Sequence, residues 1–159
     1  MRALVLGVGN PLMSDDGVGL HVLEALSRRQ PALDEVDYLD AGTLNLLLLP
    51  RFEHCEALLV LDAAQLGGTP GELCVLQGAD MDAFFRNARG SVHEVGIRDL
   101  LDAARLMGTL PARRAFVGVQ PQRVAIGSSL SPSLLASIAP AAAQARAILE
   151  AWQSDASGD

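Results

Sequence analysis

Short, uninterrupted apolar runs are the feature of this sequence that most constrains its fold. They are four to six residues long and are bounded by glycine, proline or aspartate: Ala3–Val8, Ala57–Leu61, Glu72–Leu76 and Arg114–Val119, with a more polar run at Val36–Leu39. Nearly continuous hydrophobicity, in place of strict alternation, is typical of strands that are covered on both faces. The sequence therefore predicts a largely parallel sheet.

Segments with helical spacing of apolar residues lie between these runs and supply the covers: Gly17–Arg29, Leu44–Arg51, Asp80–Asn87, Gly96–Leu106 and Pro132–Trp152. We expect Asp15 or Asp16 to cap the first helix. The order predicts an α/β fold, a three-layer α/β/α sandwich with a mostly parallel twisted sheet of about five strands. The Gly67–Gly71 connection is too short for a helical crossover, so the strand after it is expected to run antiparallel.

Length, charge and cysteine content narrow the class of protein. With 159 residues, we expect one α/β domain over residues 1–153 and a flexible tail over 154–159. No apolar stretch approaches the roughly 18 residues that span a membrane, so no membrane partner is expected. A formal charge of −7 without any Lys/Arg-rich run argues against nucleic acid as a partner. The two separate cysteines, Cys55 and Cys74, fit reduced thiols in a cytoplasmic protein.

Polar residues stand where a parallel sheet presents its ligands. In open parallel sheets, ligands gather beyond the carboxyl ends of the strands. A glycine-rich turn, Gly9–Gly19, follows the first strand, and Asp62 directly follows the apolar run Ala57–Leu61. A loop before the Gly96 helix carries Ser91, Val92, His93 and Glu94. These three places are the candidate sources of a functional site.

Nucleotide binding is one interpretation of the glycine-rich turn, because Gly7-Val8-Gly9 after a strand resembles the start of a dinucleotide-binding fingerprint. The fingerprint requires glycine where Leu12 stands. Two adjacent carboxylates, Asp15 and Asp16, would also repel a phosphate from the amino end of the helix. Nucleotide binding is therefore the minor alternative.

A divalent-metal site is the alternative that the residue types favour. Capping needs only one of Asp15 and Asp16, which leaves Asp16 available as a ligand near the positive end of a helix. Asp62 either anchors loop amides or binds an ion, because a buried carboxylate is costly unless it is paired. With His93, the set of two carboxylates and one imidazole suits zinc, nickel or a similar ion with open positions. Glu94 either orients a neighbouring ligand or faces solvent.

Other candidate groups are weaker. His21 lies within the first predicted helix and His54 in an acidic loop, and we expect both at the surface. The chain contains neither a G-x-S-x-G elbow nor an H-E-x-x-H helix, so it offers no conventional serine nucleophile or zinc-protease helix. The residues alone leave the mechanism open.

The turn after the first strand resembles the amino-terminal signature of the nickel–iron hydrogenase maturation endopeptidases. Gly9–Gly19 matches their pattern G-N-x-L-x-x-D-[DE]-G-x-G without a gap. Further segments are similar to other parts of the family pattern: Asp40-Ala41-Gly42-Thr43, Leu61-Asp62-Ala63, Ser91-Val92-His93-Glu94-Val95-Gly96 and Val117-Gly118-Val119-Gln120-Pro121. The likeness extends from residue 1 to about residue 150.

The resemblance implies an endopeptidase that removes the carboxyl-terminal extension of the [NiFe]-hydrogenase large-subunit precursor after nickel insertion. It implies cleavage after the basic residue that follows the last metal-binding cysteine motif of the client. It maps Asp16, Asp62 and His93 as both the metal ligands and the catalytic set, with nickel borne by the substrate and zinc or cadmium as possible surrogates. One hypothesis is that the ion polarises the scissile carbonyl while water attacks. A small enzyme acting on one large client is expected to be a monomer.

Asp16 is a departure from the family pattern, because several members carry glutamate at this position. The shorter side chain shifts the ion or lets Asp15 share the ligand role. A non-catalytic nickel-binding assembly factor that uses the same three residues is the principal alternative function. A nucleotide-binding α/β module is the second alternative.

Overall fold

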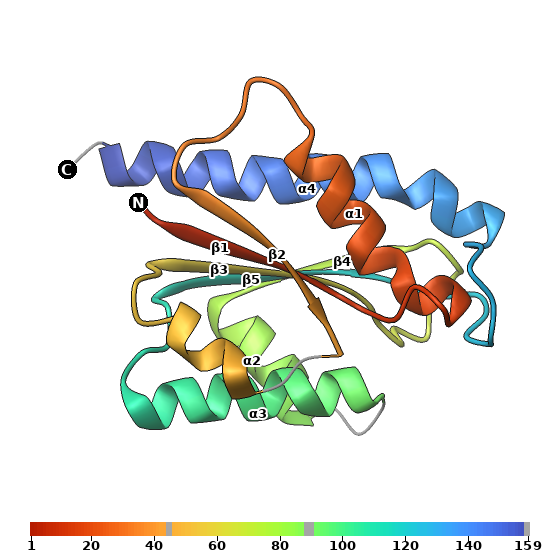
Figure 1. The fold of residues 1–159 in the computed structure, drawn as a ribbon, viewed down its shortest axis with the longest axis horizontal. Helices are drawn as coiled ribbons and strands as arrows, with labels where there is room; N and C mark the ends of the chain where they lie inside the picture. Colours follow the sequence, from red (N-terminus) through yellow and green to blue (C-terminus); the bar gives the residue numbers. More distant parts are fainter. Residues whose placement is uncertain (44–45, 88–90, 158–159) are drawn as a thin grey trace.

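A five-stranded mixed sheet forms the centre of the molecule. The computed structural model describes residues 1–43, 46–87 and 91–157 (Figure 1). The sheet order is β2-β1-β3-β5-β4, and its strands are β1 (Ala3–Val8), β2 (Val36–Gly42), β3 (Ala57–Ala63), β4 (Leu73–Gln77) and β5 (Arg113–Val119). All neighbouring pairs are parallel except β4 with β5. The predicted mostly parallel sheet with one antiparallel strand is confirmed.

Helices cover both faces of the sheet, which completes the predicted three layers. The helical elements are η1 (Ser14–Gly17), α1 (Val18–Ser27), η2 (Leu46–Arg51), α2 (Gly78–Asn87), α3 (Val92–Met107) and α4 (Pro132–Ser157). In Figure 1, α1 and α4 lie on one face, whereas α2, α3 and η2 lie on the other. The sheet thus separates two apolar cores.

The central strands explain why the apolar runs are continuous. Every residue of β1 and β3 is buried. Successive strand residues point to opposite faces. Val5 packs in the core under α1 and α4, whereas Leu4 and Leu6 pack in the core under α2 and α3. A strand between two helical layers therefore has no solvent-facing side on which polar residues would alternate.

The glycines of the Gly9–Gly19 turn permit close approach of backbone to backbone. A Cβ on Gly19 would collide with the carbonyl oxygens of Val8 and Leu61. A Cβ on Gly9, whose φ is +140°, would collide with the carbonyl oxygen of Asp16. These contacts bring α1 directly against the carboxyl ends of β1 and β3.

Several boundaries differ from the sequence-based expectation. The predicted Gly17–Arg29 helix divides into η1 and α1, and the structure shows no side-chain cap at the start of α1, so the predicted cap by Asp15 or Asp16 is wrong. Strand β3 continues through Asp62. Helix α4 extends to Ser157, beyond the predicted end at Trp152. Residues 44–45 of the predicted Leu44–Arg51 helix and 158–159 of the predicted tail lie outside the described residues.

Helix α3 begins four residues earlier than the predicted Gly96. Ser91 is its N-cap, and its Oγ accepts a hydrogen bond from the Glu94 backbone N–H at 3.2 Å. The helix ends at Gly108, which has the left-handed conformation that glycine favours there. His93 consequently lies in the first helical turn and not in a loop.

Candidate functional site

Asp16, Asp62 and His93 converge at the carboxyl edge of the parallel strands, and we call them the acid–imidazole cluster. His93 Nε2 lies 3.5 Å from Asp16 Oδ2, and its Nδ1 lies 3.4 Å from Asp62 Oδ1. The three side chains come from η1, β3 and α3. Their predicted convergence is therefore observed, whereas their role as ligands stays a prediction.

Backbone groups fix both carboxylates of the cluster. Asp16 Oδ2 accepts a hydrogen bond from the Asn10 N–H at 3.0 Å, inside the glycine-rich turn. Asp62 Oδ1 accepts one from the N–H of Ala63 at 2.7 Å. Asp62 therefore anchors a backbone amide and faces His93 as well, so both of its predicted roles are compatible with its position.

Burial and mutual contact shift the pKa values of Asp62 and His93. Asp62 is 1% exposed, and this burial raises its pKa to about 6, although contact with His93 opposes the shift. The contact with Asp62 raises the pKa of His93, against the opposite effect of burial. The pKa values of both Asp62 and His93 are therefore raised in the folded protein.

The donor types of the cluster fit a borderline divalent ion, but their arrangement is closed. Two carboxylates and an imidazole are ligands that nickel, zinc and similar ions accept. The two ring nitrogens of His93 face different carboxylates, so the three side chains do not converge on one common position for an ion. Within residues 1–43, 46–87 and 91–157, no three His, Cys, Asp or Glu side chains form a ready-made metal site. An ion held by all three would have to replace the contacts between His93 and the carboxylates.

Asp15 is not a member of the cluster and instead holds a loop that is distant in sequence. Its carboxylate accepts hydrogen bonds from the N–H groups of Gln122, Arg123 and Ser131 at 3.0, 2.8 and 2.6 Å, and from Ser131 Oγ at 2.8 Å. Burial by itself raises the pKa of Asp15, but these hydrogen bonds outweigh burial and hold it below the usual value. Asp15 is therefore an anchor for the loop after β5, a role that the sequence did not predict.

The remaining candidates lie outside the cluster. Glu94 is buried in the first turn of α3, so the alternative in which it faces solvent is wrong. His54 is exposed, as expected. His21 is half-buried on α1, where it lines a cavity with Tyr38, and is less exposed than expected.

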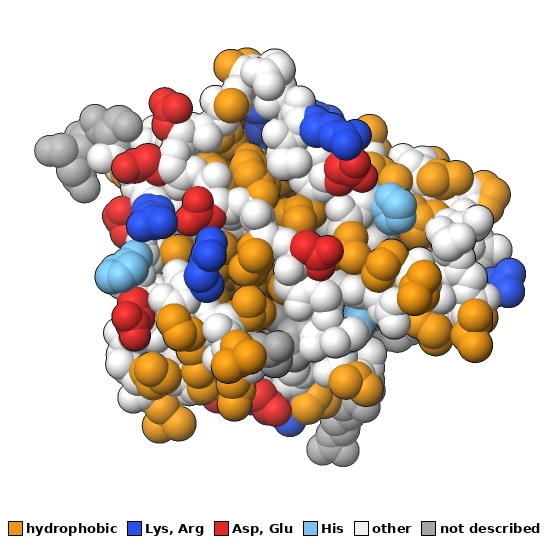
Figure 2. Space-filling view, viewed as in Figure 1, with side chains coloured by type: hydrophobic (Ala, Val, Ile, Leu, Met, Phe, Trp, Pro, Cys, Tyr) orange, Lys and Arg blue, Asp and Glu red, His pale blue; other side chains and the backbone are white. Residues whose placement is uncertain are grey.

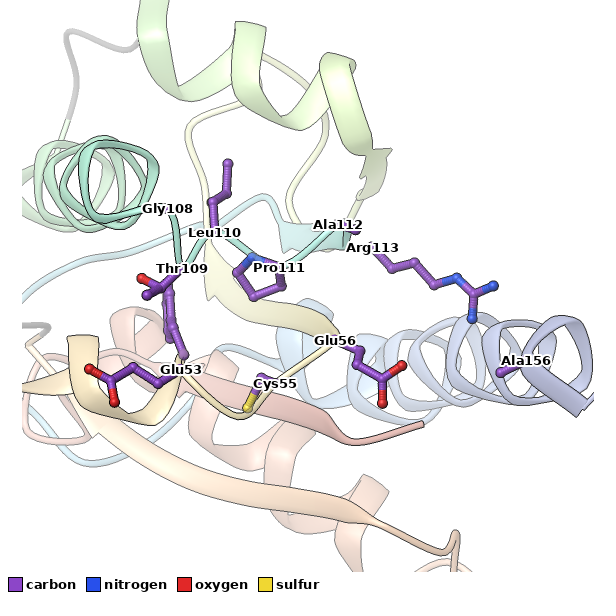
Figure 3. A pocket seen from close by; sticks show the side chains of 11 residues that line it. Glu53, Cys55, Glu56, Gly108, Thr109, Leu110, Pro111, Ala112, Arg113 and Ala156 are labelled. Atoms are coloured by element: carbon purple, nitrogen blue, oxygen red, sulfur yellow. The ribbon is translucent and has the colours of Figure 1, made fainter.

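Two cavities lie at opposite ends of the sheet. One of about 290 Å³ includes Asp16 in its wall. The other, of about 560 Å³, lies near the starts of β3 and β5 and is lined in part by Glu53, Cys55, Glu56 and Arg113 (Figure 3). Burial raises the pKa of the Cys55 thiol, so Cys55 is a poor nucleophile. Of these two cavities, the one beside Asp16 adjoins the acid–imidazole cluster.

The molecular surface agrees with the charge balance of the sequence. On the face in Figure 2, basic side chains are scattered among acidic ones and form no continuous basic patch. None of the helices in the described part of the chain is long and apolar enough to cross a membrane.

The fold and the cluster define an α/β protein with a buried acid–imidazole site at the carboxyl edge of its sheet, and comparisons with known proteins identify its family. The family model for hydrogenase maturation proteases (HycI) matches residues 20–148. The hydrogenase expression/formation protein HupD of Rhodobacter capsulatus is 40% identical over 152 residues, which cover 95% of this chain and 72% of the relative. The hydrogenase 2 maturation protease of Escherichia coli is 37% identical over 150 residues, 94% of this chain and 91% of the relative.

Solved structures lead to the same family. The hydrogenase maturating endopeptidase HybD from E. coli superimposes with a TM-score of 0.87 at 36% identity, covering 94% of this chain and 93% of that one. The [NiFe] hydrogenase maturation protease HybD from Thermococcus kodakarensis gives 0.78 at 28% identity, covering 93% and 99%. This chain belongs to the hydrogenase maturation protease family. It is a peptidase, and not a binding-only assembly factor.

Proposed function

We propose that this peptidase removes the carboxyl-terminal extension of a [NiFe]-hydrogenase large-subunit precursor after nickel insertion. In this proposal, Asp16, Asp62 and His93 recognise the nickel ion that the precursor carries. The observation that carries it is the position of His93 between two carboxylates from separate elements, with Asp62 almost fully buried. Burial and the charge of Asp16 both disfavour the ionised form of Asp62, and a bound cation would offset both effects.

Recognition of an ion that the substrate carries would make the enzyme selective for the nickel-loaded precursor. A protein can favour one state of its partner only by as much as it binds that state more tightly. In the closed cluster, His93 occupies the carboxylates. A nickel-loaded precursor gives those carboxylates a better partner than the imidazole, whereas a nickel-free precursor does not. Zinc or cadmium, which accept the same donor types, serve as surrogate ions.

Processing assays with purified proteins test this function. The precursor is prepared with and without nickel, and Asp16→Asn, Asp62→Asn and His93→Ala are compared with the unaltered enzyme. We expect cleavage of the loaded precursor alone, with large losses in all three variants. His54→Ala changes an exposed histidine outside the cluster and is the matched control. Wild-type rates in all three cluster variants would contradict recognition of nickel by these residues.

We further propose that the enzyme acts in the cytoplasm as a monomer. One cluster per chain supplies all three proposed ligands from η1, β3 and α3, so no second subunit is needed to complete the site. Sedimentation at the concentrations used for processing tests the monomer: an active species of twice the chain mass would contradict it.

A further inference from the structure

The cavity beside Asp16 has a composition unlike that of the cluster. Its wall consists of Asp16, Ala63, Ala64, Gln65, Ser91, Pro121 and Val124. Gln65 and Ser91 are polar, but Gln65 Oε1 already accepts a hydrogen bond from Gln120 and Ser91 Oγ accepts one from the Glu94 N–H. The other four side chains besides Asp16 are small or apolar. A polar peptide group placed against them would lose water without gaining a partner, whereas an apolar side chain would gain from burial. The wall therefore suits an uncharged, apolar group.

The cavity is continuous with the cluster because both contain Asp16. A client segment held at Asp16 can therefore place a neighbouring residue against this cavity. The volume of about 290 Å³ is at the lower limit of small-molecule pockets, which begin at roughly 300 Å³. A cavity of that size matches part of a peptide better than a whole cofactor.

Gln120 holds together the two segments that line the cavity, one after β3 and one after β5. Its Oε1 accepts a hydrogen bond from the Leu66 N–H at 2.7 Å, and its Nε2 donates to Gln65 Oε1 and to the Pro121 carbonyl at 3.1 Å each. The side chain is buried, and it links the segment after β3 to the segment after β5. The cavity is therefore preformed, which lowers the entropic cost of binding a peptide.

Further apolar side chains surround the same edge of the sheet. Leu12 is 67% exposed and Ile126 is 88% exposed. Hydrogen bonds tie their two segments together: Ser14 N–H to the Gly127 carbonyl and Gly127 N–H to the Leu12 carbonyl. In Figure 2, hydrophobic side chains gather at the end of the molecule where the loops after β1 and β5 lie. An extended client segment would thus meet apolar surface as it leaves the cavity.

We infer that the cavity between the ends of β3 and β5 is a specificity subsite that holds an uncharged, apolar side chain of the client next to the segment bound at the acid–imidazole cluster. Ala63, Ala64, Pro121 and Val124 select this side chain by contact. Gln120 is a positioning residue that acts through the walls. This inference rests on the proposed function, since it names the part of the client that adjoins the bound ion.

Changes to the enzyme and to the client test the subsite together. Nickel-loaded precursors are prepared with leucine, alanine, aspartate or lysine at each residue that flanks the cleaved bond, one position at a time, and kcat/KM is measured for each. We expect the unaltered enzyme to prefer leucine over both charged residues by at least about tenfold at one position, the discrimination typical of an apolar pocket. Val124→Asp is expected to remove this preference and to favour lysine at that position.

The matched control is Leu106→Asp, which adds the same charge at an exposed apolar residue of α3, outside the cavity lining. It is expected to keep the leucine preference. Ala64→Leu fills the cavity and should lower kcat/KM for leucine clients more than for alanine clients. Gln120→Ala should reduce the ratio of leucine to aspartate processing, which a loss of stability alone would not change. Circular dichroism checks the fold of each variant.

The outcomes separate this inference from the proposed function. Failure of the unaltered enzyme to cleave any nickel-loaded precursor would refute the proposed function. Cleavage by the unaltered enzyme, with Val124→Asp and Ala64→Leu showing either wild-type preferences or equal losses on all clients, would overturn the subsite alone. A changed preference among the client side chains, with unchanged affinity for free nickel, supports the subsite.

Discussion

Replacing Asp15 is expected to destabilise the protein without removing any member of the cluster. Its buried carboxylate accepts four hydrogen bonds from Gln122, Arg123 and Ser131. In Asp15→Asn, one oxygen becomes an NH₂ group that faces donors, so those bonds are replaced by unfavourable contacts. The loop after β5 then loses its link to the turn that carries Asp16.

The size of the effect follows from the exposure of the donors. A hydrogen bond to a charged group contributes about 1.5–3 kcal/mol. Gln122 and Arg123 are exposed, so their N–H groups regain water when the bond is lost, whereas Ser131 is half-buried. Counting mainly the bonds from Ser131, we expect a loss of about 2–4 kcal/mol in the free energy of unfolding. For a domain of this length that lowers Tm by roughly 4–16 °C.

The assay is urea denaturation at pH 7 and again in acid, with Asp99→Asn as the control because Asp99 is exposed on α3. Since folding lowers the pKa of Asp15, its contribution to stability is complete above the usual carboxyl range and is lost as the pH falls through the folded-state pKa. The difference between the unaltered protein and Asp15→Asn should therefore shrink below about pH 4. A loss below about 0.5 kcal/mol at pH 7, the range of ordinary surface changes, would refute the reasoning.

Two further substitutions test the packing and the electrostatics. Gly19→Ala should cost about 1–3 kcal/mol or more because its Cβ collides with two carbonyl oxygens, and Gly68→Ala, where the Cβ meets only the flexible end of the Glu72 side chain, should cost less; equal Tm values would contradict this account of the turn. Asp82→Asn should cost about 1.5–3 kcal/mol at pH 7, since Arg114 donates hydrogen bonds of 2.8 and 2.6 Å to its carboxylate. Those bonds hold the pKa of Asp82 below its usual value, so the cost should fall below about pH 4; the exposed Asp80→Asn is the control, and a pH-independent cost would exclude the pairing.

The sheet and the convergence of the cluster were predictable because both depend on local pattern plus one topological rule. Continuous burial of β1 and β3 produces unbroken apolar runs, and parallel strands bring their carboxyl ends to one edge. The predicted strand ends lay within one residue for β1, β4 and β5, whereas β2 and β3 continue farther into the site. Apolar patterning does not mark where a strand continues through a buried carboxylate such as Asp62.

The start of α3 at Val92 was predictable from a capping pattern in the sequence. Ser91 and Glu94 have the spacing of a capping box, in which a serine precedes a glutamate by three residues. Placing the helix start at Gly96 treated His93 as a loop residue. The observed cap, in which Ser91 Oγ accepts a hydrogen bond from the Glu94 N–H, fixes the first turn that carries His93.

The roles of Asp15 and Gln120 were not predictable from their local sequence. Asp15 bonds to residues more than a hundred positions away, and Gln120 joins segments more than fifty positions apart. Such partners are fixed only when the strands have assembled in their final order. A buried polar residue next to a strand end could equally have been a ligand, a cap or an anchor.

Strand β5 comes last along the chain, yet it lies between β3 and β4 in the sheet. A polypeptide still emerging from the ribosome therefore carries Asp16, Asp62 and His93 long before it has the loop that Asp15 and Gln120 secure beside them. Until residues 113–131 are synthesised and inserted, β4 has no neighbour and the cavity lacks one of its walls. The edge of the sheet that holds the cluster and the cavity is thus completed late in biosynthesis, when the final strand enters the middle of the sheet.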